Sequence, residues 1–318
     1  MTDGVFIGVD TSNYTTSVGI VESGGGLIAN LKLPLPVKSG ERGLRQSDAV
    51  FAHIKNLPEL LDKVKLLTKD KKILGVGVST RPRNKEDSYM PCFLSGVNVA
   101  TALSVASGAP LYEFSHQCGH IMAAIYSAGR EIPKEFAAFH ISGGTTELVL
   151  AKWTGRDFVC QTLGGTGDVN AGQIIDRIGV YMGMPFPAGK YIEEAAFNNQ
   201  RSIPKKKPSV KGTYANLSGL ENIAVKLYDE TKDSSLTAAF VLEYIGTAVI
   251  SVCENARQEI GDIPFVFAGG VMSNSIIKAR LAQKFDAYFA EPLLSADNAV
   301  GIAVLAKNAY KYEKETEV

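Results

Sequence analysis

Two histidines stand four residues apart in the segment HQCGH, residues 116–120. In a helix such residues share one face, so the imidazoles of His116 and His120 can bind one metal ion. Asp297, in the segment SADNA, is the candidate for a third ligand. Histidines without a metal and an aspartate that only caps a helix are the alternatives. Because Gln117 stands where an HExxH hydrolase has its glutamate, that class of peptidase is excluded.

Two short turns rich in Ser, Thr and Gly are candidates for binding phosphate. Small residues let backbone amides approach phosphate oxygens, although most such turns carry these residues only to reverse the chain. Two of them in corresponding places predict a grip on one polyphosphate from both sides. The residues are Asp10, Thr11 and Ser12 in the first turn, and Ser142, Gly143, Gly144 and Thr145 in the second.

Two later segments are candidates for binding a nucleoside. In GGTGDVNAGQIIDRIG, residues 164–179, Asp176 can accept hydrogen bonds from ribose hydroxyls, and the following Gly189 allows a ligand to approach. In FAGGVMSN, Gly269 and Gly270 end a strand and Asn274 opens a helix, which is a usual nucleotide crevice in α/β proteins. Helix capping, by Asp168 in the first segment and Asn274 in the second, is the alternative.

The elements that carry these residues predict an α/β fold. Two hairpins share one pattern, a strand, a small-residue turn, Thr-Thr and a second strand, which indicates an internal duplication. The hairpin strands are expected at 5–10 and 15–21, and at 136–141 and 145–150. Further strands are expected at 73–80, 109–114 and 264–270. Helices are expected at 50–67, 88–112, 170–183, 236–256, 273–285 and 298–310, and one more is expected to carry HQCGH at 116–120. The halves are predicted at 1–130 and 131–297, with 298–318 returning to the first.

Composition excludes several other classes. Lys plus Arg and Asp plus Glu are 33 each in 318 residues, so no overall charge attracts nucleic acid or anionic lipid. The four cysteines form no CxxC pair, which argues against a disulfide framework. The start has no secretory pattern, so we expect a cytoplasmic protein. The charge-free segment 88–112 is expected to be a buried helix and not a membrane span.

Taken in order, the motifs resemble the TsaD/Gcp (Kae) family. They are GVDTS, the HxxxH pair, SGGTTEL, AGQIIDRIG with its P-x-G, AGGVMSN and SADNA. The resemblance implies an actin-like ASKHA fold of two duplicated RNase H-like domains, with a nucleotide and metal cleft between them. It also implies transfer of a threonylcarbamoyl group from threonylcarbamoyl-AMP to N6 of an anticodon-loop adenosine in tRNA.

The resemblance assigns roles to the candidate residues. It implies that one iron or zinc ion binds His116, His120 and Asp297, and that the second turn contacts the adenylate or ATP. Asp176, Gly189 and Asn274 would then hold the nucleoside. A TsaB-like partner protein and tRNA are implied as partners, with Arg201, Lys205–Lys207 and Lys211 as the candidate RNA contacts.

Several positions depart from the family pattern. They are Asn13-Tyr14, the loop TRPRNKEDSYMP at 80–91, Cys118, Thr145 and Glu221. The metal and nucleotide positions are kept while their surroundings change. An alternative is therefore a nucleotide-binding paralogue, either an ATPase or carbamoyltransferase with another acceptor, or a non-catalytic assembly or regulatory subunit.

Overall fold

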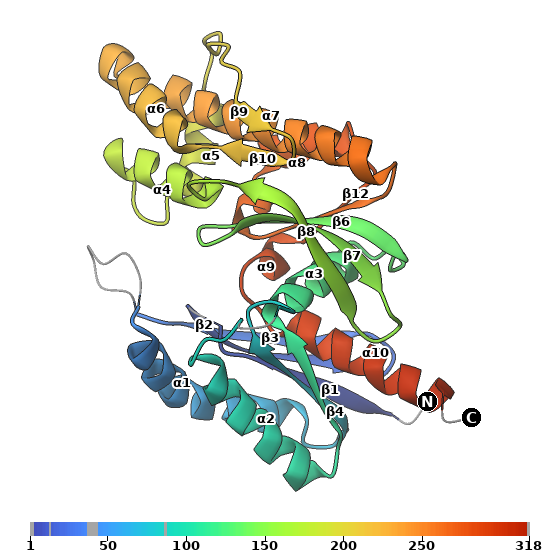
Figure 1. Cartoon of the computed structure of the whole chain (residues 1–318). Coiled ribbons are helices and arrows are strands. Elements are labelled where there is room, and N and C mark those ends of the chain that lie inside the picture. Colours follow the sequence, from blue (N-terminus) through green and yellow to red (C-terminus); the bar gives the residue numbers. More distant parts are fainter. Residues whose placement is uncertain (1–2, 13, 37–43, 86–87, 317–318) are drawn as a thin grey trace. The chain divides into compact units, whose positions relative to one another are not determined.

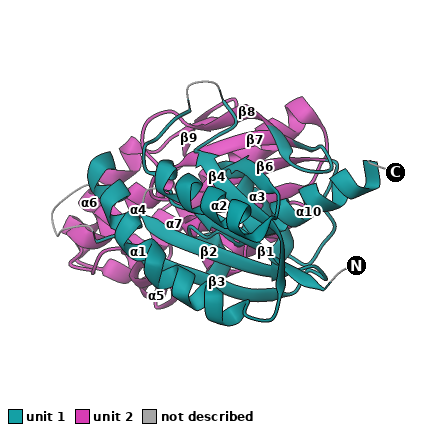
Figure 2. Ribbon diagram, turned by 90° about the horizontal axis from the view of Figure 1, so that it is seen from below, with its two compact units in different colours: residues 1–134, 152–159, 293–318 teal, residues 135–151, 160–292 magenta. Residues whose placement is uncertain are grey.

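The structure is a computed structural model that describes residues 3–12, 14–36, 44–85 and 88–316; Asn13 lies outside these ranges. The chain forms two compact units (Figure 2). Unit 1 comprises Met1–Lys134, Lys152–Val159 and Leu293–Val318, and unit 2 comprises Glu135–Ala151 and Cys160–Pro292. That the two halves are separate domains divided near residue 130 stays a prediction.

Unit 1 is built on a five-stranded sheet with the order β3-β2-β1-β4-β5. The three N-terminal strands pair antiparallel, whereas β4 and β5 run parallel to β1. Every residue of β1 is buried, as expected for a central strand with a continuous apolar run. The strands are β1 (Gly4–Asp10), β2 (Thr15–Glu22), β3 (Leu27–Pro34), β4 (Lys72–Arg81) and β5 (Leu111–Ser115).

Unit 2 repeats this order in a seven-stranded sheet, β12-β11-β6-β7-β8-β10-β9. Its β8-β7-β6-β11-β12 part matches β3-β2-β1-β4-β5, with β6, β11 and β12 parallel as β1, β4 and β5 are. The duplication inferred from the two hairpins is therefore present in the topology. The strands are β6 (Glu135–Ile141), β7 (Thr146–Trp153), β8 (Phe158–Thr166), β9 (Ser209–Lys211), β10 (Tyr214–Asn216), β11 (Phe265–Ala268) and β12 (Ala287–Phe289).

Four helices pack on the sheet of unit 1 (Figure 1). The last helix contacts β1 and β4, and it lies beside α3. One correction concerns the charge-free segment: its helix, α2, is buried on one face only, and Val105 is 79% exposed. The helices are α1 (Gln46–Leu67), α2 (Phe93–Ser107), α3 (His116–Ser127) and α10 (Val300–Thr316).

The core of unit 2 is organised around α7, whose apolar residues face the sheet and the neighbouring helices. This helix is long and apolar enough to cross a membrane, but 83% of its apolar stretch is buried within the protein. A core helix of a globular unit has the same composition. The helices are α4 (Ala171–Tyr181), α5 (Gly189–Phe197), α6 (Ser218–Thr231), α7 (Ser234–Ile260), η1 (Gly270–Ser273) and α8 (Ser275–Ala282), and α9 (Pro292–Ser295) follows them.

Candidate metal centre

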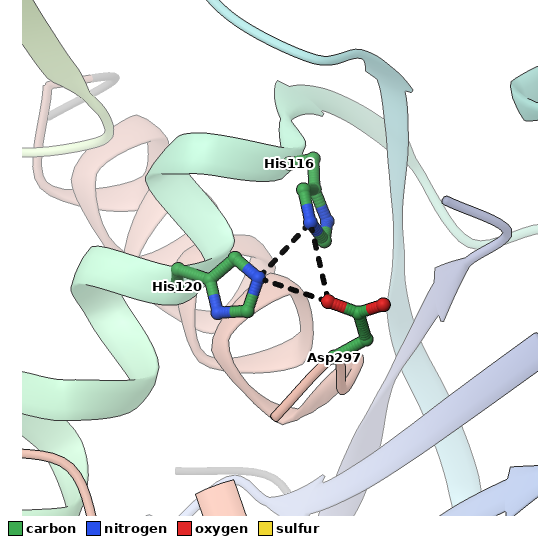
Figure 3. A group of neighbouring side chains, drawn as sticks. All are labelled: His116, His120 and Asp297. Atoms are coloured by element: carbon green, nitrogen blue, oxygen red, sulfur yellow. Dashed lines mark hydrogen bonds and ion pairs between the residues drawn. The ribbon is translucent and has the colours of Figure 1, made fainter. Parts of the chain in front are cut away.

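The two histidines and the aspartate predicted as metal ligands converge within unit 1. His116 and His120 project from the first turns of α3, and Asp297 lies just before α10 (Figure 3). The Nε2 atoms of the histidines are 3.0 Å apart. Asp297 Oδ1 lies 3.6 Å from Nε2 of His116 and 3.3 Å from Nε2 of His120. Three donor atoms from two distant parts of the sequence therefore face one point.

Local structure explains this convergence. Ser115 caps α3 by accepting a hydrogen bond from the backbone N–H of Cys118, which fixes the start of the helix at His116. The two helices then approach closely, because a Cβ added to Gly301 of α10 would collide with the carbonyl oxygen of Gly119 in α3. Neither glycine was singled out from the sequence, although Gly119 lies inside HQCGH.

Asp297 is not the cap of the last helix. The side chain of Asn298 accepts a hydrogen bond from Val300 N at 3.0 Å and so takes that role. Asp297 is left to face the histidines, with its side chain 28% exposed. The capping alternative for this residue is therefore wrong.

Asp10 is completely buried and holds the first histidine in place. The Nδ1–H group of His116 donates to Asp10 Oδ2 at 2.7 Å, while Asp10 Oδ1 accepts from Ser12 N at 2.8 Å. A carboxylate on one imidazole nitrogen orients the ring and leaves the other nitrogen for a metal. Asp10 therefore supports a metal ligand, and the phosphate-binding role predicted for it has no support in this geometry.

Thr11 and Ser12, also predicted to bind phosphate, are buried as well. The hydroxyl of Thr11 donates to the carbonyl of Cys92 at 2.9 Å and accepts from Gly96 N at 3.0 Å, so it ties the turn to α2. The first turn is thus part of the framework around α3. For Thr11 this placement favours a supporting role over ligand contact, whereas the buried Ser12 Oγ has no hydrogen-bond partner among the described residues.

The charges of the cluster depend on one another. Burial disfavours an imidazolium, yet the Asp10 carboxylate raises the pKa of His116 to about 9. Burial, together with the adjacent His116, lowers the pKa of His120. Burial would raise the pKa of Asp297, but the hydrogen bond from His120 and the charge of His116 lower it. A positive charge among these groups is therefore favourable, whether a proton or a metal supplies it.

The donor set fits iron or zinc. Ligands at about 2.1 Å from a tetrahedral ion are separated by about 3.4 Å, close to the 3.0, 3.3 and 3.6 Å found between these atoms. Two imidazoles and one carboxylate are the ligands of catalytic zinc sites and of the facial triad of non-haem iron. Both types keep positions open for a substrate.

The second turn, in unit 2, borders open space, whereas the first turn is buried. Ser142 Oγ accepts from Gly144 N at 3.3 Å and Thr145 N at 3.1 Å, which shapes the turn. A Cβ added to Gly143 or Gly144 would meet no atom within 4 Å, so the space beside both is open. Gly172 of α4 packs directly against the turn, since its own Cβ would lie 2.6 Å from Gly143 N. The sequence did not point to this glycine.

The other predicted nucleotide residues also lie in unit 2. Asp176 accepts a hydrogen bond from Ala188 N at 2.7 Å, and burial raises its pKa. This bond places the carboxylate beside Gly189, where an added Cβ would meet nothing. Asp176 is therefore held at the entrance to α5 beside open space.

Of the predicted residues that follow β11, two have structural roles and one borders open space. Gly269 has a φ of +96° and its Cβ would collide with the carbonyl oxygen of Ile141, so backbone packing requires a glycine there. Gly270 borders open space. Asn274 caps α8 by accepting from Ile277 N at 3.0 Å. The capping alternative is confirmed for Asn274, and its side-chain amide nitrogen takes no part in the cap.

Asp168 also caps a helix. It accepts from the backbone N–H groups of Leu217 and Ser218, at 2.8 and 2.9 Å, and so caps α6 instead of α4.

Two departures from the family pattern have partners inside the protein. The Asn84 side chain donates to Cys118 Sγ at 3.4 Å, so the substituted loop after β4 is bonded to the substituted position in α3. Glu221 accepts a hydrogen bond from Arg177 at 3.0 Å. Among the predicted RNA contacts, Arg201 is paired with Asp233 at 3.2 Å, whereas Lys205–Lys207 are exposed.

Comparisons with known proteins give the family and the fold of this chain. Residues 49–304 match the TsaD family, described as tRNA N6-adenosine threonylcarbamoyltransferase. A protein of that name from Streptococcus suis is 28% identical, with 98% of this chain and 94% of the relative covered. HypF from T. kodakarensis has a TM-score of 0.63 at 12% identity, with 98% of this chain and 48% of HypF covered.

The activator of 2-hydroxyisocaproyl-CoA dehydratase from Clostridium difficile, solved with bound ADPNP, has a TM-score of 0.53 at 16% identity; 99% of this chain and 98% of the activator are covered. At these identities the two structures show the fold, which is the expected actin-like α/β fold. The family match spans most of the chain. The chain belongs to the TsaD family and is a transferase.

Proposed function

We propose that this protein catalyses metal-dependent transfer of a threonylcarbamoyl group from threonylcarbamoyl-AMP to N6 of an anticodon-loop adenosine in tRNA. The observation that carries the proposal is the convergence of His116, His120 and Asp297 within 3.0–3.6 Å. The family match and the relative's name support the reaction type.

In this proposal His116 and His120 bind iron or zinc through Nε2, and Asp297 binds it through Oδ1. The ion would supply Lewis acidity and a fixed point for an oxygen of the donor. Asp10 holds the His116 ring in the tautomer that presents Nε2. Burial of the cluster keeps its ligands fixed, because His120 is only 3% exposed.

The adenylate of the donor, or ATP, would be held by residues of unit 2. The open turn Ser142–Thr145 offers backbone N–H groups to phosphate oxygens. Asp176, beside Gly189, can accept hydrogen bonds from ribose hydroxyls, and the amide nitrogen of Asn274 can donate to the nucleoside. Gly270 borders open space and so permits close approach, whereas Gly269 supports the backbone.

We further propose that the protein works in the cytoplasm, with tRNA and with a TsaB-like partner. The exposed lysines 205–207 and Lys211 are the candidate contacts with RNA phosphates. Arg201 is a weaker candidate, since its guanidinium is paired with Asp233.

A second candidate is transfer from the same kind of donor to another acceptor. Glu221 favours it, because a carboxylate paired with Arg177 stands where the family has a lysine. Such a reversal of charge would alter the attraction of any anionic acceptor at this position.

The test begins with the metal content of the full-length protein, measured after reconstitution with iron or zinc. We expect about one ion per chain in the parent and none in a His116→Ala, His120→Ala double variant. His140→Ala is the matched control, since this histidine lies on β6 of unit 2, outside the cluster. Circular dichroism checks that all three proteins are folded.

Transfer is then assayed with threonylcarbamoyl-AMP and an unmodified tRNA. Activity that is present in the parent and in His140→Ala but absent from the double variant would support the proposal. A folded parent that takes up no metal would contradict it. Metal uptake with donor consumption but an unmodified tRNA would favour the second candidate.

A further inference from the structure

A lysine lies in the same row of the sheet as the carboxylate that supports the metal ligands. Asp10 of β1 pairs with Ser17 of β2, and Ser17 pairs with Lys32 of β3. Side chains directly opposite one another on neighbouring strands point to the same face of the sheet. At about 4.8 Å per strand, Lys32 is therefore about 10 Å along the row from Asp10, on the face where Asp10 meets His116.

The contacts of Lys32 agree with this placement. Its Nζ donates to the carbonyl oxygen of Leu293 at 2.9 Å, and Asn30 Nδ2 donates to the same oxygen at 3.0 Å. Leu293 opens the segment that leads to Asp297. Burial lowers the pKa of Lys32, while the Asp297 carboxylate acts in the opposite direction, so ammonium and carboxylate are within electrostatic range.

A cation beside a metal-binding carboxylate needs a physical reason. An ammonium within electrostatic range of Asp297 competes with a metal for the same negative charge and repels the ion itself. The loop does not require it, because Asn30 already donates to the Leu293 carbonyl without any charge. An ammonium has three N–H donors, and the bond to Leu293 uses one of them.

We propose that Lys32 binds a phosphate oxyanion of the ligand that the His116, His120 and Asp297 cluster holds through its metal. An anion between the ammonium and the metal would turn the repulsion into attraction on both sides. The inference depends on the proposed metal site. It adds a specificity-determining residue from the edge strand β3, outside every motif recognised in the sequence.

Two roles of Lys32 predict different effects of its removal. If the lysine only clamps the 293–297 segment, Lys32→Met loosens Asp297 and weakens metal and anion binding together. If it binds phosphate, Lys32→Met removes a repulsive charge, so the metal binds more tightly while phosphate binds more weakly. Opposite signs for the two affinities therefore identify the phosphate-binding role.

The experiment uses the full-length protein loaded with cobalt(II), whose visible spectrum reports both metal binding and a change of ligand. Inorganic phosphate is the probe, and acetate tests whether any oxyanion suffices. For Lys32→Met we expect metal affinity to rise about threefold and phosphate affinity to fall about tenfold. Lys32→Arg should retain most of the phosphate affinity. Asn30→Ala, which removes the uncharged clamp, should leave phosphate affinity within about threefold.

Three results would overturn the inference. A joint loss of metal and phosphate affinity in Lys32→Met, matched by Asn30→Ala, would assign the lysine to the clamp. Equal losses for acetate and phosphate would overturn the assignment to phosphate. Failure of the parent to bind cobalt, iron or zinc would remove the proposed metal site itself, and this result is visible before any anion is added.

Discussion

The two hairpin turns of this protein share a topology but differ in what surrounds them. The first turn, after β1, is buried, and two of its side chains bond to the protein: Asp10 to His116 and Thr11 to α2. The second turn, after β6, has two glycines beside open space. Equivalent positions in a duplicated fold have thus acquired a supporting role in one unit and an accessible surface in the other.

This difference shows that composition alone does not identify a ligand-binding turn. Both turns carry the small and hydroxyl-bearing residues that suit phosphate. What separates them is whether the backbone and side chains already have partners. In the first turn α2 supplies a partner for Thr11 and α3 supplies one for Asp10. This turn therefore contributes to function by orienting the metal ligand His116.

The largest loss of stability is expected at the close contact between α3 and α10, which lies beside the metal ligands. Gly301→Ala places a methyl group against the backbone of Gly119, and backbone cannot move aside cheaply. We expect a loss of about 3 kcal/mol in the free energy of unfolding, measured by urea denaturation. Gly143→Ala in the open turn is the matched control. Equal stability of the two variants would show that the close approach of α3 and α10 is not required.

A pH effect of similar size is expected from His53, which is fully buried behind the first hairpin and bonded to Thr16 at 2.8 Å. Burial lowers its pKa to about 4, from an ordinary 6.5, although Asp10 opposes this. The unfolded chain therefore binds the extra proton first, and stability is lost as pH falls from about 6.5 to 4. The loss amounts to about 2–3 kcal/mol.

His53→Gln provides the comparison for this prediction. The free energies of unfolding of parent and variant, measured between pH 7 and 4, should differ most at pH 7 and converge as the pH falls. A constant difference across this range would show that the protonation of His53 does not contribute.

Asp10→Asn tests the supporting role of the first turn. The amide keeps the shape of the side chain but loses the charge that orients the His116 ring. We expect metal affinity to fall about 10- to 100-fold, measured by competition with a chelator. Unchanged metal affinity, with phosphate binding lost instead, would return Asp10 to the ligand-binding role predicted from the sequence.

The smallest effect on folding is expected in the second turn. Gly143→Ala adds a methyl group in open space, so its unfolding free energy should stay within about 0.5 kcal/mol of the parent. If the turn binds the nucleotide, affinity for AMP should fall, because the methyl group blocks backbone approach. Titration with AMP, followed by calorimetry, measures this. If the variant bound AMP as tightly as the parent, the second turn would not contact the nucleotide, and the proposed difference between the two turns would be wrong.

Several elements could be predicted because their determinants are local. The hairpins at 5–21 and 136–150 follow from apolar strands around a small-residue turn, and the structure confirms both. The same holds for α1, α4, α7 and α10, whose apolar spacing or length is typical of helices. By contrast β3, β12 and α6 were missed, since short or mixed segments become strands and helices only beside their neighbours.

For the site, local sequence patterns indicate which residue types are available: two histidines on one helix face, an aspartate before the last helix, and two turns able to bind phosphate. The packing of distant segments brings Asp297 to the histidines, through the contact of Gly119 with Gly301, and lets Asp10 orient His116. It also brings Lys32 to the carbonyl oxygen of Leu293, four residues before Asp297. These roles depend on contacts between residues more than a hundred positions apart, and no local pattern specifies such distances.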